Sequence, residues 1–331
     1  MIIPSNTCRK LIKIITRLAL ANFSVALCYS VLAQDQEWRT YGGDLASTHY
    51  SPLDTINHDN FNDLEIAWEF DTSNFGISPE FNFQSTPLMV NRTIYTTAGS
   101  RRAVVALDAL TGEILWISRI DEGARASNAP RKLSGRGLAW WDDGSEMGRI
   151  IYVTPGYQMI ALDAETGTRL KDFGLEGIVD LKQEFDQSLD LETGEVGLHA
   201  APIISNGIVI VGSAFRPGRM PTSREKPKGH VRGYDAQTGN RLWIFHTIPQ
   251  SNEYGNDTWL NNSWTFTGYG GVWAQMTADP VLGVVYLPTE TATGDSYGGH
   301  RHGDNLFTNS VVAIDVKSGE IIEFVDEEIE K

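Results

Sequence analysis

One short pattern recurs four times along this 331-residue chain and constrains its fold more than any other feature. In each copy, aliphatic residues lead into Asp-x-x-Thr/Ser-Gly, and a second, mainly apolar run follows. The Asp side chain can cap the turn and the Gly can adopt a positive φ, so each copy predicts two strands joined by a tight turn. The copies occupy 104–116, 159–171, 231–243 and 311–323, and two of them end in Trp116 and Trp243.

A second hairpin signal precedes each copy. The clearest is 201–211, where two apolar runs flank Asn206-Gly207, a dipeptide typical of type I′ turns. Similar signals lie at 87–97 around Asn91-Arg92, at 150–153 and at 272–287. Two hairpins per repeat make four antiparallel strands in meander order, which is typical of a propeller blade.

The sequence therefore predicts an all-β chain in which residues 34–331 form a β-propeller segment of about four blades, each with four antiparallel strands. The blades are expected near 86–116, 138–171, 199–243 and 272–323. The repeats are 55, 72 and 80 residues apart, longer than the roughly 40 to 50 residues of common propeller repeats, so the loops are long enough to form a site.

Residues 64–70 also have the pattern of a fourth blade strand, but nothing before them supplies the first three strands. In a closed ring those strands would come from the other end of the chain. This chain stops at Lys331, so the fragment is expected to lack its blade.

The first 33 residues are predicted to be a secretory signal. Four basic residues precede an apolar run that ends in Ser-Val-Leu-Ala, the order typical of a cleaved leader. We therefore expect an exported or periplasmic mature protein. An uncleaved membrane anchor is one alternative, although Asn22 and Ser24 interrupt the run and it is shorter than about 20 residues. A second alternative is a lipoprotein with Cys28 as the modified residue, but Leu27 occupies the preceding position, where lipoprotein signals have a small residue.

Charge and cysteine content exclude several functions. The net charge of −15 becomes −19 when the four basic residues of the signal are removed, so the chain repels polyanions and we expect no nucleic-acid partner. Both cysteines, Cys8 and Cys28, lie in the signal. The predicted mature chain therefore has no disulfide and no cysteine-based metal or redox site.

Several further motifs follow one another in a specific order. They are Tyr41-Gly42-Gly43-Asp44, Tyr50-Ser51-Pro52-Leu53 and Ile56-Asn57; Ala106, Asp108, Gly112 and Trp116 of the first repeat; Arg136-Gly137-Leu138-Ala139-Trp140-Trp141; and Gly229-His230-Val231-Arg232-Gly233-Tyr234-Asp235. In this combination, from about Trp38 to Gly319, the chain resembles the quinoprotein dehydrogenases, in the branch around membrane-type glucose dehydrogenase. It resembles their N-terminal half only.

The resemblance implies an eight-bladed propeller that binds pyrroloquinoline quinone (PQQ) and a calcium-type divalent ion near its axis. Such enzymes oxidise a sugar or an alcohol and pass electrons to a quinone or a cytochrome, which implies a possible peripheral association with the membrane. The metal polarises the quinone carbonyl, a carboxylate takes the alcohol proton and hydride passes to the cofactor.

The resemblance also implies cofactor-binding residues. Trp273 matches the Trp that stacks on the quinone, with blade packing as the alternative, and Arg136 matches the Arg that pairs with a cofactor carboxylate, with an exposed loop cation as the alternative. Gln84 matches a polar contact, or is a solvated edge residue. His199 stands at a position usually filled by a small hydroxyl residue, and Thr291 at a further position near the axis.

Departures from the family pattern are informative. The residues after Gly212-Ser213, where relatives tend to place a metal ligand, are Ala214-Phe215-Arg216-Pro217, so the metal ligands are unassigned. The spacing His300-x-His302-x-Asp304 is more typical of a solvated loop than of a metal site.

The fourth repeat has Glu323 instead of Trp, and no His-His-x-Leu-Trp-Asp segment with the catalytic Asp follows. We therefore assign no catalytic residue and expect the chain to be inactive by itself. The alternative function is a non-catalytic β-propeller that serves as a binding scaffold in the cell envelope.

Overall fold

The computed structural model describes residues 37–76, 80–144, 148–216, 225–294 and 296–326, so the predicted signal lies outside the described residues. The chain divides into two compact units, which we describe separately. In the smaller unit, residues Tyr50–Glu65 are almost entirely exposed, and their only helical turn among the described residues is η1 (Phe61–Asp63). The larger unit, Trp38–His49 with Ile66–Lys331, contains all the sheets of the described residues.

The larger unit contains four four-stranded antiparallel sheets, and within each sheet the strands are hydrogen-bonded in chain order. Blade 1 comprises β1 (Leu88–Val90), β2 (Thr93–Ala98), β3 (Ala103–Asp108) and β4 (Ile114–Ser118). Blade 2 comprises β5 (Ala139–Trp141), β6 (Arg149–Val153), β7 (Gln158–Asp163) and β8 (Ile178–Asp180). Blade 3 comprises β9 (Ile203–Ser205), β10 (Ile208–Val211), β11 (His230–Asp235) and β12 (Arg241–His246). Blade 4 comprises β13 (Thr277–Asp279), β14 (Val284–Pro288), β15 (Ser310–Asp315) and β16 (Ile321–Asp326).

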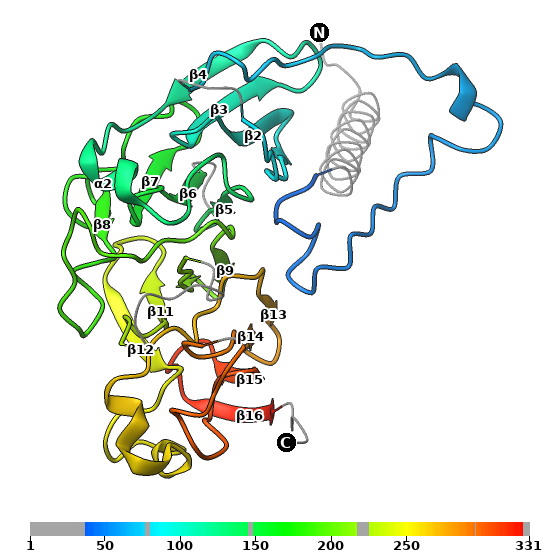
Figure 1. The fold of residues 1–331 in the computed structure, drawn as a ribbon. Coiled ribbons are helices and arrows are strands. Elements are labelled where there is room, and N and C mark those ends of the chain that lie inside the picture. Colours follow the sequence, from blue (N-terminus) through cyan, green and yellow to red (C-terminus); the bar gives the residue numbers. More distant parts are fainter. Residues whose placement is uncertain (1–36, 77–79, 145–147, 217–224, 295, 327–331) are drawn as a thin grey trace, which may run out of the picture. The chain divides into compact units, whose positions relative to one another are not determined.

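The predicted fold class is confirmed, because these sheets are four meander blades of a partial propeller. They follow one another along an arc in chain order (Figure 1). The helices of the larger unit are short: α2 (Ala124–Asn128), η2 (Asn256–Thr258) and η3 (Leu260–Thr265). Among the described residues, none of the helices has the length and hydrophobicity of a transmembrane span.

The recurring Asp-x-x-Thr/Ser-Gly turns form as the sequence predicts. In all four copies the Asp carboxylate accepts the backbone N–H three residues later, at 2.7–2.8 Å, and also accepts the hydroxyl of that residue. The glycine that follows has φ between 70° and 74° in every copy. Asn206-Gly207 joins β9 to β10 with φ values of 51° and 75°, as a type I′ turn requires.

The core lies between consecutive blades. Three buried apolar clusters include Val104 with Ile150 between blades 1 and 2, Ile151 with Val209 between blades 2 and 3, and Ile210 with Val285 between blades 3 and 4. Blades 2 and 3 are therefore covered on both faces by neighbouring sheets, whereas blades 1 and 4 each pack against one neighbouring sheet among the described residues.

Tryptophans of one blade dock on the repeated turn of the next blade. Trp116 of blade 1 packs on Gly167 of blade 2, and Trp243 of blade 3 packs on Gly319 of blade 4. Their indole N–H groups donate to backbone carbonyls beside those turns at 3.0 and 2.8 Å. A Cβ added at Gly319 would lie 2.7 Å from the indole of Trp243, so this position requires glycine for its close contact as well as for its φ of 72°.

The fragment 64–70 is not a strand in the structure, contrary to the sequence prediction. Trp68 nevertheless packs on Gly112 of blade 1 and donates its indole N–H to the Ala109 carbonyl at 3.2 Å. The fragment therefore occupies the docking position of an outer strand. It has no β-ladder because none of the described strands runs beside it.

The outer strand of blade 2 also differs from the expectation. The pattern predicts a strand directly after Gly167, but only an isolated bridge between Leu162 and Arg169 forms there, and β8 begins at Ile178. The intervening residues bury Phe173, which packs against Gly239 of blade 3 in place of a tryptophan. The inserted residues between Arg169 and Ile178 supply this apolar contact, and the outer strand β8 therefore begins later in the chain than the repeat pattern predicts.

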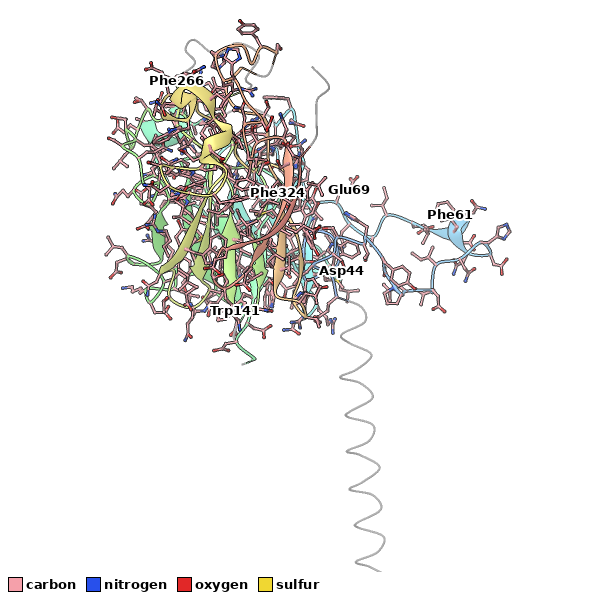
Figure 2. The ribbon with its side chains drawn as sticks, turned by 90° about the horizontal axis from the view of Figure 1, so that it is seen from below. Asp44, Phe61, Glu69, Trp141, Phe266 and Phe324 are labelled. Carbon is pink, nitrogen blue, oxygen red and sulfur yellow. The ribbon has the colours of Figure 1, made fainter. Side chains whose placement is uncertain are left out.

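Residues Trp38–His49 cross the blades at one end. Trp38 exchanges two backbone hydrogen bonds of 2.9 Å with Met89 of blade 1, and Leu45 accepts the N–H of Ala278 of blade 4 at 2.8 Å. Figure 2 shows Asp44 of this segment and Trp141 of blade 2 at one end of the blades, with Phe266 at the other end. The segment thus joins the first blade to the fourth.

We expect the docking contact to contribute more stability than the turn glycine alone. Gly207→Ala should cost about 1–2 kcal/mol, because alanine is strained at positive φ, and nothing lies within 4 Å of the added Cβ. Gly319→Ala has a similar φ but should cost about 1–3 kcal/mol more, because its Cβ would overpack Trp243. Urea unfolding of both variants measures the difference, and equal losses of stability would contradict the docking interpretation.

Candidate functional site

Four of the five candidate cofactor-binding residues occupy equivalent places in the four blades. Each stands three or four residues before the first strand of its blade: Gln84 before β1, Arg136 before β5, His199 before β9 and Trp273 before β13. Because all four blades have the same meander order and pack face to face, these segments meet at one end of the arc. Thr291 follows β14, which runs back toward that end because it is antiparallel to β13.

Three of these side chains form one group, which we call the Trp273 cluster: Arg136, His199 and Trp273. The guanidinium carbon of Arg136 lies 5.4 Å from the centroid of the Trp273 ring, and the His199 imidazole stacks on the same indole with centroids 5.8 Å apart and planes 20° apart. The backbone N–H of Arg136 also donates to the His199 carbonyl at 2.6 Å. Trp273 is 37% exposed, in contrast to the docking Trp243, which is 7% exposed.

Gln84 and Thr291 lie at the margin of this cluster. Gln84 is exposed and stands two residues before Thr86, whose N–H donates to the Arg136 carbonyl at 3.0 Å. No hydrogen bond joins the Gln84 side chain to the cluster within the described residues. The Thr291 carbonyl accepts the N–H of Gly270 at 3.3 Å, so Thr291 supports the loop that leads to Trp273.

The His199 imidazole is held neutral. Burial first, and then the charges of Arg131, Arg136 and Arg102, lower its pKa from 6.5 to about 3. Its Nδ1 is buried and has no hydrogen-bond partner among the described residues. A neutral imidazole with one unused polar atom can donate a hydrogen bond to a ligand or accept one from it.

Arg102, which sequence reasoning did not single out, holds the loops around the cluster together. Its guanidinium is fully buried and donates to the carbonyls of Val153 and Leu198 at 2.7 Å, Leu133 at 3.1 Å and Arg131 at 3.2 Å. Burial lowers its pKa to about 10, so it stays protonated at neutral pH. An arginine in a loop looks like an exposed cation in the sequence, and no local signal identifies the carbonyls it binds.

The cluster suits a planar anion. An accessible indole can stack on a flat π system, guanidinium groups can pair with carboxylates, and a neutral imidazole adds a polar contact without a charge. PQQ is a planar quinone that carries several carboxylates, so the residues present fit it. The unpartnered Nδ1 of His199 and the exposed surface of Trp273 are the observations that support this fit.

The same residues do not fit a calcium-type ion. No group of three or more His, Cys, Asp or Glu side chains comes together in the described part of the chain, and this includes the stretch 300–304. At the position where the family resemblance implies a ligand, Ala214 instead exchanges backbone hydrogen bonds of 2.7 and 2.9 Å with Gly197. The structure therefore assigns no metal ligands, and we derive no chemical step through a metal.

Comparison with known proteins relates most of the chain to one family of enzyme domains. The family described as "PQQ: Glucose/ethanol/alcohol dehydrogenase, beta-propeller domain" matches residues 38–322. The glycerol dehydrogenase large subunit of Gluconobacter thailandicus is 31% identical over 293 residues, which cover 86% of this chain and 38% of that protein. Quinoprotein glucose dehydrogenase A of Acinetobacter calcoaceticus is 26% identical over 312 residues, or 87% of this chain and 37% of that protein.

Solved structures agree with this result. The quinohemoprotein alcohol dehydrogenase of Comamonas testosteroni superimposes with a TM-score of 0.71 and 25% sequence identity, over 89% of this chain and 44% of that one. This chain therefore spans less than half the length of each of these three relatives.

The neutral state of His199 predicts a pH dependence of stability. The folded-state pKa is depressed below the unfolded value of 6.5, so the contribution of His199 is fully present above pH 6.5 and is lost as the pH falls toward about 3. We expect the unfolding free energy of the wild type to fall between about pH 7 and about pH 5, and that of His199→Asn to fall less. Urea unfolding of both proteins across this window measures the two slopes, and identical slopes would show that His199 is not held neutral.

Proposed function

The chain belongs to the glucose/ethanol/alcohol dehydrogenase family of β-propeller domains, and on this premise we propose that the Trp273 cluster is the PQQ-binding surface of a dehydrogenase. The observation that carries the proposal is the accessible indole of Trp273 with the guanidinium of Arg136 and the neutral imidazole of His199 directly beside it. A propeller without a ligand at this end has no evident need for this combination.

Each residue has a definite task in this proposal. Trp273 stacks on the quinone plane, Arg136 pairs with a carboxylate of the cofactor, and His199 forms a hydrogen bond to its polar edge. Bound PQQ supplies the two-electron oxidation of an alcohol group. Arg102 acts at a distance from the ligand, because it holds the loops that carry these side chains in register.

The rest of the assignment concerns the protein as a whole. The substrate class is an alcohol or a sugar and the electron acceptor is a quinone or a cytochrome, with a possible peripheral association with the membrane. The family relationship supports these proposals, and the pattern of residues 1–33 supports an exported or periplasmic location. A calcium-type ion belongs to the expectation from the family, but no ligand set among the described residues supports it.

PQQ should bind to the purified chain, and the two principal contacts should be separable by mutation. We expect Arg136→Gln to weaken binding about 10-fold or more, because it removes a charge-assisted hydrogen bond. Trp273→Ala should weaken it about 10-fold through lost stacking. Isothermal titration calorimetry measures both dissociation constants.

The matched control for this experiment is Arg149→Gln. Arg149 also lies over a tryptophan, with its guanidinium carbon 5.6 Å from the Trp141 ring. Trp141 pairs with Arg149 at the last residue of β5, whereas Arg136 of the cluster precedes the first residue of that strand. The control should bind PQQ as the wild type does. An absence of binding heat with the wild type at high PQQ concentration would overturn the proposal and favour the scaffold function instead.

Binding and turnover are expected to differ in this chain. Glu290 is a carboxylate beside the Trp273 loop, but its Oε1 accepts the backbone N–H of Gly271 at 3.3 Å, and we assign it to support of this loop and not to the role of a base toward an alcohol. We therefore expect no robust dye reduction when PQQ, calcium and glucose or a short alcohol are added. Rapid, substrate-dependent reduction would contradict this expectation and leave the binding proposal intact.

A further inference from the structure

Arg131 approaches the Trp273 cluster from the loop between α2 and β5. Its backbone carbonyl accepts a hydrogen bond of 3.2 Å from Arg102. Its Cβ and Cγ lie 3.4 and 3.6 Å from the place where a Cβ on Gly197 would stand, two residues before His199. The side chain of Arg131 therefore crosses from the second blade's entry loop to the entry segment of the third blade.

The guanidinium of Arg131 lacks the kind of partner that other partly buried arginines have. Its Nε is buried and has no hydrogen-bond partner among the described residues. By contrast, Arg125 pairs with Asp180 at 2.6 Å and Arg149 pairs with Asp172 at 3.0 Å. A half-buried guanidinium whose Nε has lost its hydration without gaining a hydrogen bond is costly, so an additional polar partner such as a bound anion would offset that cost.

The surroundings of Arg131 carry excess positive charge. Burial lowers the pKa of Arg131 most; the Glu290 carboxylate opposes this shift and raises the pKa, whereas the Arg136 guanidinium lowers it, and the net shift is downward. Arg131 is also the charge that most strongly opposes protonation of His199. One carboxylate thus faces two guanidinium groups, and the fully buried Arg102 adds a third cation behind them.

We propose that Arg131 binds a second carboxylate of the planar anion that the Trp273 cluster accepts. This inference rests on the proposed function and deepens it, because it specifies a ligand with at least two carboxylates bound by Arg131 and Arg136. The neighbouring cation does not share the role: Lys132 is exposed and its ammonium donates to the Ser127 carbonyl. Two guanidinium groups on one loop distinguish a polycarboxylate from a neutral or monoanionic quinone.

The test compares PQQ with its trimethyl ester, which keeps the planar quinone but has no free carboxylate. Arg131→Gln should weaken binding of PQQ about 10- to 100-fold, because it removes a charge-assisted hydrogen bond. Arg131→Lys should recover part of this loss, since it restores the charge without the planar fork. Binding of the ester should be the same in the wild type and in Arg131→Gln.

Lys132→Gln is the matched control, because it removes one positive charge from the same loop. It should bind PQQ as the wild type does. A second readout needs no ligand: in Arg131→Gln the His199 pKa, followed by NMR of the imidazole, should rise from its depressed value. Unchanged folding of the variants is checked by urea unfolding, and the Lys variant keeps the test valid if the Gln variant is unstable.

The outcomes separate this inference from the proposed function. If the wild type binds PQQ and Arg131→Gln binds it equally well, the role of Arg131 is wrong and the proposed function stands. If the wild type does not bind PQQ but binds benzene-1,2,4-tricarboxylate, and Arg131→Gln loses that binding, the proposed function is wrong and the role of Arg131 as a carboxylate-binding residue stands. If the wild type binds neither compound, both are overturned.

Discussion

The packing of a tryptophan on the backbone of a left-handed glycine in the next blade is the contact on which the rest of the structure depends. Trp116 and Trp243 make this contact across two blade boundaries, and each also donates its indole N–H to a carbonyl beside the turn. A short turn positions the glycine, and the glycine's missing side chain leaves room for the ring. Because the same contact recurs, consecutive sheets stack face to face with similar geometry, and the segments that enter their first strands gather at one end.

The site follows from that stacking, but its side chains are held by a different interaction. Arg102 buries its charge and donates to three loop carbonyls and to the carbonyl at the end of β6, so the loops carrying Arg131, Arg136 and His199 share one rigid support. The desolvation cost of this buried cation is offset by its four hydrogen bonds. Burial first, and then this concentration of positive charge, lowers the pKa of His199 and keeps it neutral, and the positive charge leaves the surface beside Trp273 attractive to an anion.

Local chemistry predicted most of the fold and only part of the site. Turn residues predicted all four blades, because a capped Asp and a positive-φ Gly specify a hairpin without help from distant residues. The prediction was wrong for the outer strand of blade 2, because an insertion that buries Phe173 displaces β8 along the chain. It was also wrong for a strand at 64–70, because no described strand runs beside this segment. In the site, Arg136, His199 and Trp273 come together, whereas Gln84 and Thr291 lie at its margin.

The amino-acid sequence by itself determined the repeat, the strand order within each blade and the resemblance to quinoprotein dehydrogenases, because these depend on residues close together in the chain. Only the tertiary structure decided which cations act on one another. Arg102 and Arg131 are separated from His199 by 97 and 68 residues, and their roles arise from burial and from carbonyls contributed by different blades. Electrostatic interactions of this kind depend on distance and desolvation, which no local pattern encodes.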